Sequence, residues 1–88
     1  SPAYPNPFNP VTTINYGLPK DANLTLFIYN LQGRLVEELH NSFTNAGFYE
    51  IKWNASALSS GIYFVKIHAA DIDGRSIYSK TQKLMLVK

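Results

Sequence analysis

The chain has 88 residues, the length of one small domain, and 14 per cent of them are aromatic, which is enough to fill a thin core without cross-links. It contains no cysteine, which excludes disulfide frameworks, thiolate metal sites and cysteine nucleophiles. The formal charge of +2 is spread along the chain, so no nucleic-acid surface is expected, and no apolar run approaches the ~20 residues of a membrane span.

The first ten residues read SPAYPNPFNP, and their four prolines exclude a helix or a central strand because each removes a backbone donor. We expect residues 1–10 to form a proline-rich linker and residues 11–88 one folded domain. Tyr4 and Phe8 are available to hold this segment against the domain. No signal peptide of the usual kind is visible, so an export signal, if the chain is exported, is expected upstream in a longer protein.

Alternation of apolar and polar residues predicts a series of short strands. Within the third of them Val36 and Leu39 are three positions apart, which breaks the alternation and indicates a bulge or one helical turn. A loop is expected between the third and fourth strands, over residues 41–46. The predicted strands cover residues 11–16, 24–29, 34–40, 47–53 and 61–69.

The stretch from Trp53 to Ile67 organises the rest of the chain. A strand that ends on Trp53 is followed by a polar corner of about seven residues, and a second strand begins at Gly61 and carries Tyr63. A loop of this length between two strands predicts a crossing from one sheet to the other rather than a tight hairpin. Leu58, the apolar residue of the corner, is expected to close the end of the core.

Residues 75–88 are too many for one strand of a small sandwich, so this run is expected to bend near residues 80–82 and to contribute to two places. An Asp-Gly pair at 73–74 indicates a hairpin with a two-residue turn before it. The fold class that follows is all-β, a small immunoglobulin-like β-sandwich of about seven strands.

No set of residues forms a convincing catalytic or metal site. Asp71, Asp73 and Gly74 resemble the start of a calcium loop, but Gln82 stands where the bidentate glutamate should be, which favours a hairpin turn. His40 and His68 have no spaced partner for a metal, and nothing in the sequence places a histidine near a serine.

Glu37 and Glu38 are adjacent, so in a strand they point to opposite faces and cannot act as an acid/base pair. We therefore predict no enzyme activity and no cofactor. Aromatic residues on the strands leave open a carbohydrate-binding surface, although covering a thin core is the simpler role for them. These residues are Phe27, Tyr29, Phe43, Phe48 and Phe64.

Four motifs in order resemble the C-terminal sorting domain of the type IX (Por) secretion system, type A. They are YPNPFNP at 4–10, a strand ending on a turn glycine at 28–34, the corner with WNA and SGIY at 53–63, and KLMLVK at 83–88. The residues that carry the resemblance are Pro5, Asn6, Pro7, Phe8, Asn9, Pro10, Gly33, Trp53, Ser60, Gly61 and Tyr63, followed by the final run.

The resemblance implies a non-catalytic immunoglobulin-like domain at the C-terminus of a cargo protein. In that family the cargo crosses to the periplasm, the type IX translocon recognises the C-terminal domain, and a sortase-like peptidase usually removes it after outer-membrane passage. The cargo is then commonly attached to the cell surface through an anionic lipopolysaccharide. By position, the residues expected to meet the translocon are Lys83, Leu84, Met85, Leu86, Val87 and Lys88.

Two alternatives remain. The immunoglobulin-like domain of flagellar hook-capping proteins shares the turn glycine and the SGxY pattern, and there the domain is a structural assembly module. A carbohydrate-binding module of a larger secreted enzyme is the other. The short corner and the final lysine-flanked run favour sorting over the hook-capping alternative, because a hook-capping domain would normally continue.

Overall fold

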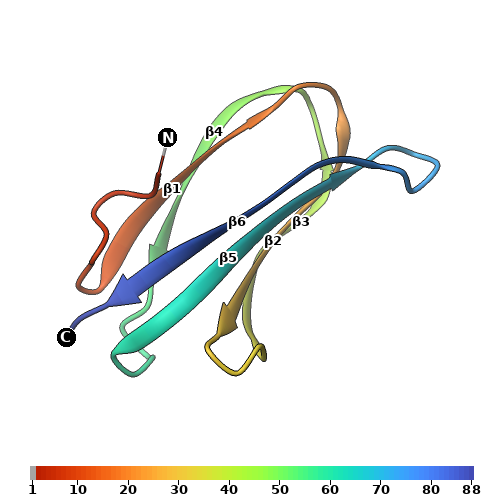
Figure 1. Ribbon diagram of the computed structural model, residues 1–88. Helices are drawn as coiled ribbons and strands as arrows, with labels where there is room; N and C mark the ends of the chain where they lie inside the picture. The colour runs from red at the N-terminus through yellow and green to blue at the C-terminus, as the bar shows by residue number, and fades with distance from the viewer. Residues whose placement is uncertain (1) are drawn as a thin grey trace.

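The computed structural model describes residues 2–88, and that part of the chain folds into six β-strands (Figure 1). The strands form two antiparallel sheets, a two-stranded sheet β1–β4 and a four-stranded sheet in the order β3–β2–β5–β6. The all-β sandwich is therefore confirmed. The strand bounds are β1 Val11–Leu18, β2 Ala22–Asn30, β3 Leu35–Thr44, β4 Gly47–Asn54, β5 Gly61–Ala70 and β6 Ser76–Leu86.

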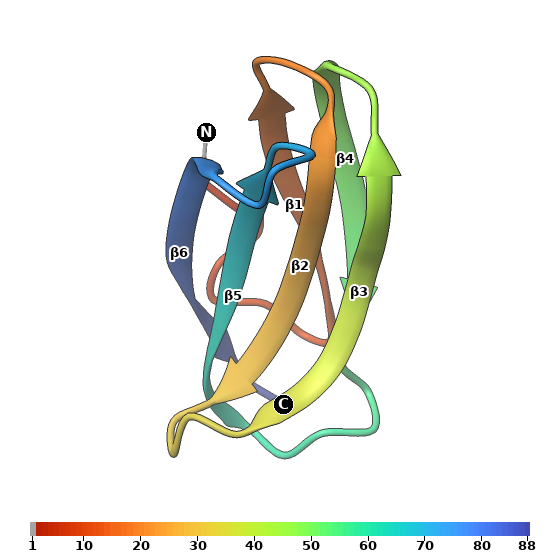
Figure 2. The ribbon, with the colours of Figure 1, turned by 90° about the vertical axis from the view of Figure 1, so that its right-hand side faces the viewer.

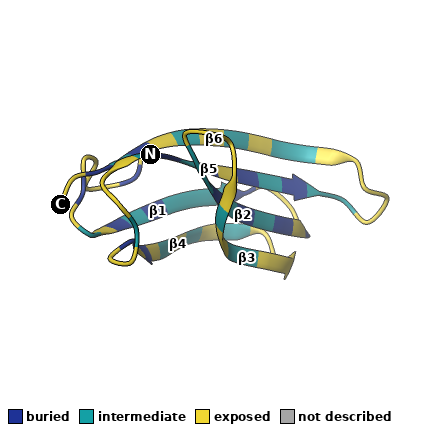
Figure 3. Cartoon of the chain, turned by 90° about the horizontal axis from the view of Figure 1, so that it is seen from below, coloured by how far each residue is buried: buried dark blue, intermediate teal, exposed yellow. Residues whose placement is uncertain are grey.

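The core lies between the two sheets, and the two-residue period of the strands fills it. Leu24, Leu26 and Ile28 of β2 are at most 1% exposed, and the residues between them face outward or are half-buried. Val65 and Ile67 continue the same layer on β5. Figure 2 shows β1 and β4 lying behind the larger sheet, and Figure 3 shows buried positions alternating with the others along the strands.

The crossing between the sheets occurs where the sequence predicts it. β4 belongs to the smaller sheet and β5 to the larger, and the corner after Asn54 joins them. Trp53 and Tyr63 are 1% and 7% exposed, so both aromatic side chains are in the core, and Leu58 of the corner packs against that core. The expectation for this stretch is confirmed.

The bend predicted for residues 75–88 is wrong. β6 is one strand that pairs with β5 from Ala70 opposite Ser76 to Gly61 opposite Leu86. The molecule is elongated, with a long axis of 40 Å, so it accommodates an eleven-residue strand of about 36 Å. This is why the described residues hold six strands rather than about seven.

Two local expectations change, and a third is confirmed. The hairpin loop before β6 has three residues, because the Asp71 N–H donates to the carbonyl of Arg75 and Gly74 takes a positive φ of 82°. β3 continues through residues 41–44, where a loop was expected. The predicted bulge is confirmed and is double, since the pairing of β3 with β2 skips both Val36 and Leu39.

Candidate functional site

The segments that carry the four sequence motifs meet at one end of the sandwich. Figures 1 and 2 both place the β2–β3 turn, the β4–β5 corner and the last residues of the chain at this end. The proline-rich segment reaches the same end beside the edges of both sheets. We call these contacts the motif cluster, and they involve residues 5–10, 53–63 and 83–88.

The proline-rich segment joins the outer edges of β1 and β6. Tyr4 and Thr13 exchange two backbone hydrogen bonds of 3.0 Å each, so the segment pairs with β1. Further on, the Phe8 N–H donates to the carbonyl of Met85, and the Val87 N–H donates to the carbonyl of Phe8, both at 2.9 Å. One short segment thereby closes the gap between the two sheets at this end.

Only one of the two aromatic residues expected to anchor this segment does so through its side chain. Phe8 is 2% exposed and its ring lies 5.5 Å from the Trp53 ring, centre to centre. The Tyr4 side chain is 78% exposed, so Tyr4 contributes through its backbone.

Asn6 binds the outer edge of β6 with its side chain. The amide nitrogen donates to the carbonyl of Lys83 at 2.8 Å, and the amide oxygen accepts from the N–H of Met85 at 3.0 Å. A side-chain amide has the donor and acceptor of a peptide group, so Asn6 takes the place of one peptide unit of a neighbouring strand. This satisfies polar groups that a sheet edge would otherwise expose.

Trp53 is the centre of the motif cluster. Its ring packs against Phe8 on one side and makes an edge contact with Tyr63 at 5.8 Å. Its indole N–H donates to a carboxylate oxygen of Glu37 at 3.0 Å, which removes the cost of burying that donor. The sequence offered no indication of this pairing because Glu37 lies on a different sheet.

The β4–β5 corner holds the last residue of the chain. The Lys88 N–H donates to the hydroxyl of Ser60 at 3.0 Å, and the Lys88 ammonium donates to the carbonyl of Ser56 at 2.6 Å. The corner also contacts the proline-rich segment, since the Ala55 N–H donates to the carbonyl of Pro10 at 2.8 Å. The polar residues of the corner thus connect the beginning and the end of the described chain.

A second interaction of the proline-rich segment was not anticipated from the sequence. Thr12 is 1% exposed, and its hydroxyl donates to the carbonyl of Pro5 at 2.6 Å. A threonine on the inward-facing side of a strand is the one sequence feature that could have indicated a buried polar partner.

The six residues expected to meet the translocon divide by exposure. Leu84 and Leu86 are at most 1% exposed and belong to the core, so their side chains cannot contact a partner in the folded domain. Four other side chains of this run face solvent wholly or in part: Lys83, Met85, Val87 and Lys88.

Gly33 lies in the turn after β2, where its φ of 83° suits glycine. The Asn30 side chain holds this turn by accepting from the N–H groups of Gln32 and Arg34. The turn glycine of the motif therefore has a structural role.

One expectation about chemistry is corrected: a histidine does lie near a serine. The Ser42 hydroxyl is 3.1 Å from Nε2 of His40, because residues two apart in a strand share a face. Nε2 is also 2.8 Å from the Thr44 hydroxyl, so two hydroxyls share one nitrogen. A catalytic triad also needs an acid bonded to the other ring nitrogen and a site for substrate beside the nucleophile. The three main hollows among residues 2–88 are not lined by His40, Ser42 or Thr44.

The described residues hold no group of three metal-ligating side chains, and each of their buried side-chain polar atoms has a hydrogen-bond partner. No helix within residues 2–88 is long and apolar enough to span a membrane.

The fold and the motif cluster define a small β-sandwich in which the sequence motifs near its two ends and its central corner are joined by hydrogen bonds and aromatic packing. The family model of the secretion system C-terminal sorting domain matches residues 2–86, nearly the whole chain. The chain belongs to this family, and the resemblance seen in the sequence is confirmed. The family comprises sorting signals of the type IX secretion system, which direct proteins toward the outer membrane or the cell surface.

A solved structure supports the same assignment. PorZ of Porphyromonas gingivalis, described as an essential bacterial surface component of the type IX secretion system, is similar to this chain with 27% sequence identity and a TM-score of 0.62. The similarity covers 98% of this chain and 11% of PorZ, so the chain corresponds to a small part of that protein. No curated protein matches the chain.

Proposed function

We propose that this domain is the sorting signal of a larger exported protein, and that the type IX translocon recognises it at the motif cluster. Two observations support the proposal together: membership of the sorting family, and the convergence of three of its four motifs into one hydrogen-bonded end. A core alone does not require this convergence, because a sandwich can bury its apolar faces with any polar loops at its ends. The cargo lies upstream in the same polypeptide.

The translocon would contact the side chains of residues 83–87 rather than pair a strand of its own with the backbone of these residues. The outward N–H and C=O groups of Met85, and the N–H of Val87, are already bonded to the proline-rich segment. Strand addition there would first have to displace that segment. The surface that remains is formed by Lys83, Met85, Val87 and Lys88, two of which are basic. An acidic, partly apolar surface on the translocon would complement it.

After export, a sortase-like peptidase would separate domain and cargo upstream of the proline-rich segment, and the cargo would be attached to the surface. Hydrogen bonds along residues 4–8 hold the segment against two strands, which makes these residues poor protease substrates while the domain is folded. Cleavage would therefore fall on the chain that precedes them.

The test is export of a reporter that carries a signal peptide and this chain at its C-terminus, in a host with an intact type IX apparatus and in a translocon-deficient strain. Translocon-dependent appearance of the reporter outside the cell is expected. Retention of a folded reporter in the periplasm of both strains would refute the proposal.

Charge-reversal variants locate the recognition surface. Lys83→Glu is expected to reduce export several-fold without unfolding the domain, because Lys83 is exposed on the outer face of β6. The matched control is Lys20→Glu, an exposed lysine in the connection from β1 to β2. Figure 1 shows this connection at the end of the sandwich opposite the β2–β3 turn. Equal export of the two variants would exclude the motif cluster as the recognition surface.

A further inference from the structure

The edge of the smaller sheet is only partly covered. The proline-rich segment pairs with β1 at Thr13, and beyond that point no strand among residues 2–88 covers the outer edge of β1. Thr13 directs both its N–H and its C=O away from β4, toward Tyr4. Asn15 and Gly17 follow at the two-residue spacing of a strand, so their backbone groups point the same way.

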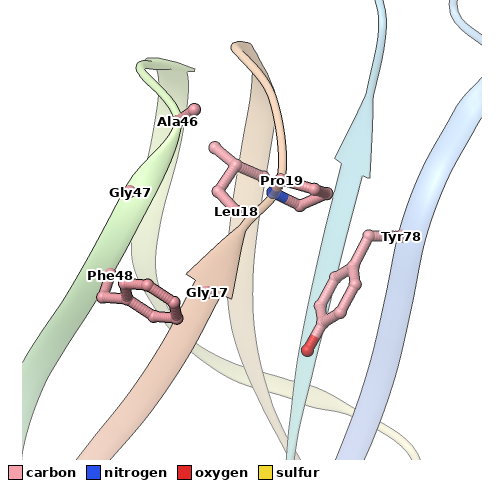
Figure 4. A pocket seen from close by; sticks show the side chains of 7 residues that line it. All are labelled: Gly17, Leu18, Pro19, Ala46, Gly47, Phe48 and Tyr78. Atoms are coloured by element: carbon pink, nitrogen blue, oxygen red, sulfur yellow. The ribbon is translucent and has the colours of Figure 1, made fainter.

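A hollow of about 640 Å³ lies beside this edge (Figure 4). Leu18 and Tyr78 approach it from β1 and β6, and Phe48 lies beside Gly17 with 95% of its side chain exposed. A Cβ on Gly17 would come within 3.1 Å of the Phe48 ring, so the glycine is what lets the ring lie against β1. A chain running along this edge would cover the aromatic residue.

The existing pairing sets the direction and register of such a chain. Tyr4 and Thr13 are antiparallel partners, so the chain that precedes Tyr4 is directed along β1 toward Gly17. Ala3 is 4% exposed and belongs to the core, which agrees with a position opposite the buried Ile14. The alternation expected of a paired strand has therefore begun by residue 3.

We propose that the last residues of the linker from an upstream cargo add to β1 as a third strand of the smaller sheet and cover the hollow. This inference rests on the proposed function, since it requires a cargo before residue 1. Continuing the register places Pro2 opposite Asn15, where proline supplies only a carbonyl, and the residue directly before Ser1 opposite Gly17. That residue exchanges two hydrogen bonds with Gly17.

The register also predicts which residue of the linker places its side chain in the hollow. The second residue before Ser1 lies opposite Leu18, whose side chain faces inward, so this residue faces inward over Tyr78 and is apolar. Three strands over four is the division of strands in a seven-stranded immunoglobulin-type sandwich, so the linker completes the smaller layer.

Amide hydrogen exchange of Gly17 tests the pairing. The 88-residue chain is compared with the same chain preceded by its natural linker, and with a control in which the second residue before Ser1, the one that would face the hollow, is replaced by aspartate. The linker is expected to slow exchange of the Gly17 N–H by about tenfold or more, because that N–H then exchanges only on local opening. The aspartate control is expected to return it to the rate of the 88-residue chain, because a charged side chain does not enter an apolar hollow and the added strand then does not pair.

Each of three other exchange results would overturn the proposal. Equal Gly17 exchange in all three proteins means that the linker does not pair. Protection of the 88-residue chain that increases with protein concentration assigns the edge to a second copy. Slower exchange at Ser79 on β6 instead of Gly17 places the added strand on the larger sheet. The measurement uses purified protein without translocon, so it can fail while export succeeds, and the reverse.

Discussion

The side chain of Asn6 accepts a hydrogen bond from the backbone of Met85 across 79 positions of sequence. Together with its bond to the Lys83 carbonyl, this contact connects the first family motif directly to the last. Two motifs that lie far apart in the sequence are therefore in direct contact in the folded domain. The segment expected to be a linker and the run expected to be recognised form one surface.

Replacing Asn6 by alanine is expected to lower the free energy of unfolding by about 1 to 2 kcal/mol, because two hydrogen bonds to the β6 edge are lost. Urea unfolding of the 88-residue chain measures it. Asn9→Ala is the matched control, an exposed asparagine of the same segment, and should change stability by less than about 0.5 kcal/mol. Equal effects of the two substitutions would show that the Asn6 contacts contribute nothing in solution.

Trp53→Ala is expected to destabilise the domain by about 3 to 5 kcal/mol, because a large buried side chain is removed from between Phe8 and Tyr63. Domains of this kind have a total stability of about 5 to 15 kcal/mol, so the variant is close to unfolding. Thermal unfolding followed by circular dichroism measures the change. An unchanged melting temperature would contradict the central position of Trp53.

A milder variant separates packing from hydrogen bonding at the same site. Trp53→Phe keeps an aromatic ring but leaves Glu37 without the indole donor. It is expected to cost less than the alanine change, and Glu37→Gln, which keeps an acceptor, less again. A Glu37→Gln effect as large as that of Trp53→Ala would assign the stabilisation to charge instead of packing.

The sequence predicted the parts of the fold that depend on local patterns. The two-residue period identifies β2 and β5 because each alternates between the core and the surface, as Leu26 and Val65 show. The crossing after Trp53 was also predictable, since the corner is too long for a tight turn. The bulges at Val36 and Leu39 appeared as a break in alternation.

Contacts between distant residues could not be predicted in this way. No local pattern pairs Asn6 with β6, or Trp53 with Glu37, because hydrogen-bonding partners on different strands depend on the register of the whole sheet. The length limit applied to residues 75–88 failed because the sandwich is long, and the lengths of other strands set that dimension. The order of the four motifs was informative for a different reason: it matched a known family, whereas the alternation of apolar and polar residues identifies strands but not a family.

Stability at high pH is expected to depend on Tyr16. Burial, and then the neighbouring Tyr49 phenol stacked on it, raises the pKa of Tyr16 above its usual 10.0. The folded state therefore favours the neutral phenol, so its contribution is fully present below pH about 10 and is lost as the pH rises through the folded-state pKa. Tyr16→Phe should lose less stability than the wild type between pH about 8 and about 11. If the free energies of unfolding of the wild type and the Tyr16→Phe variant differ by a constant amount across that range, the pKa of Tyr16 is not raised by folding.

The final run is expected to divide into core and surface positions when residues are replaced singly. Leu84→Ala should cost about 2 to 5 kcal/mol because its side chain is fully buried, whereas Val87→Ala, 48% exposed, should cost under about 1 kcal/mol.

Deleting residues 84–88 removes two core leucines and the partner of Phe8, so it should unfold the domain and cannot report on recognition alone. Urea unfolding of the three variants, followed by the export assay on those that fold, separates the two roles. A Val87→Ala domain that folds normally but is exported poorly would identify Val87 as a translocon contact. A deletion variant that folds with a normal melting temperature would show instead that residues 84–88 lie outside the cooperative core.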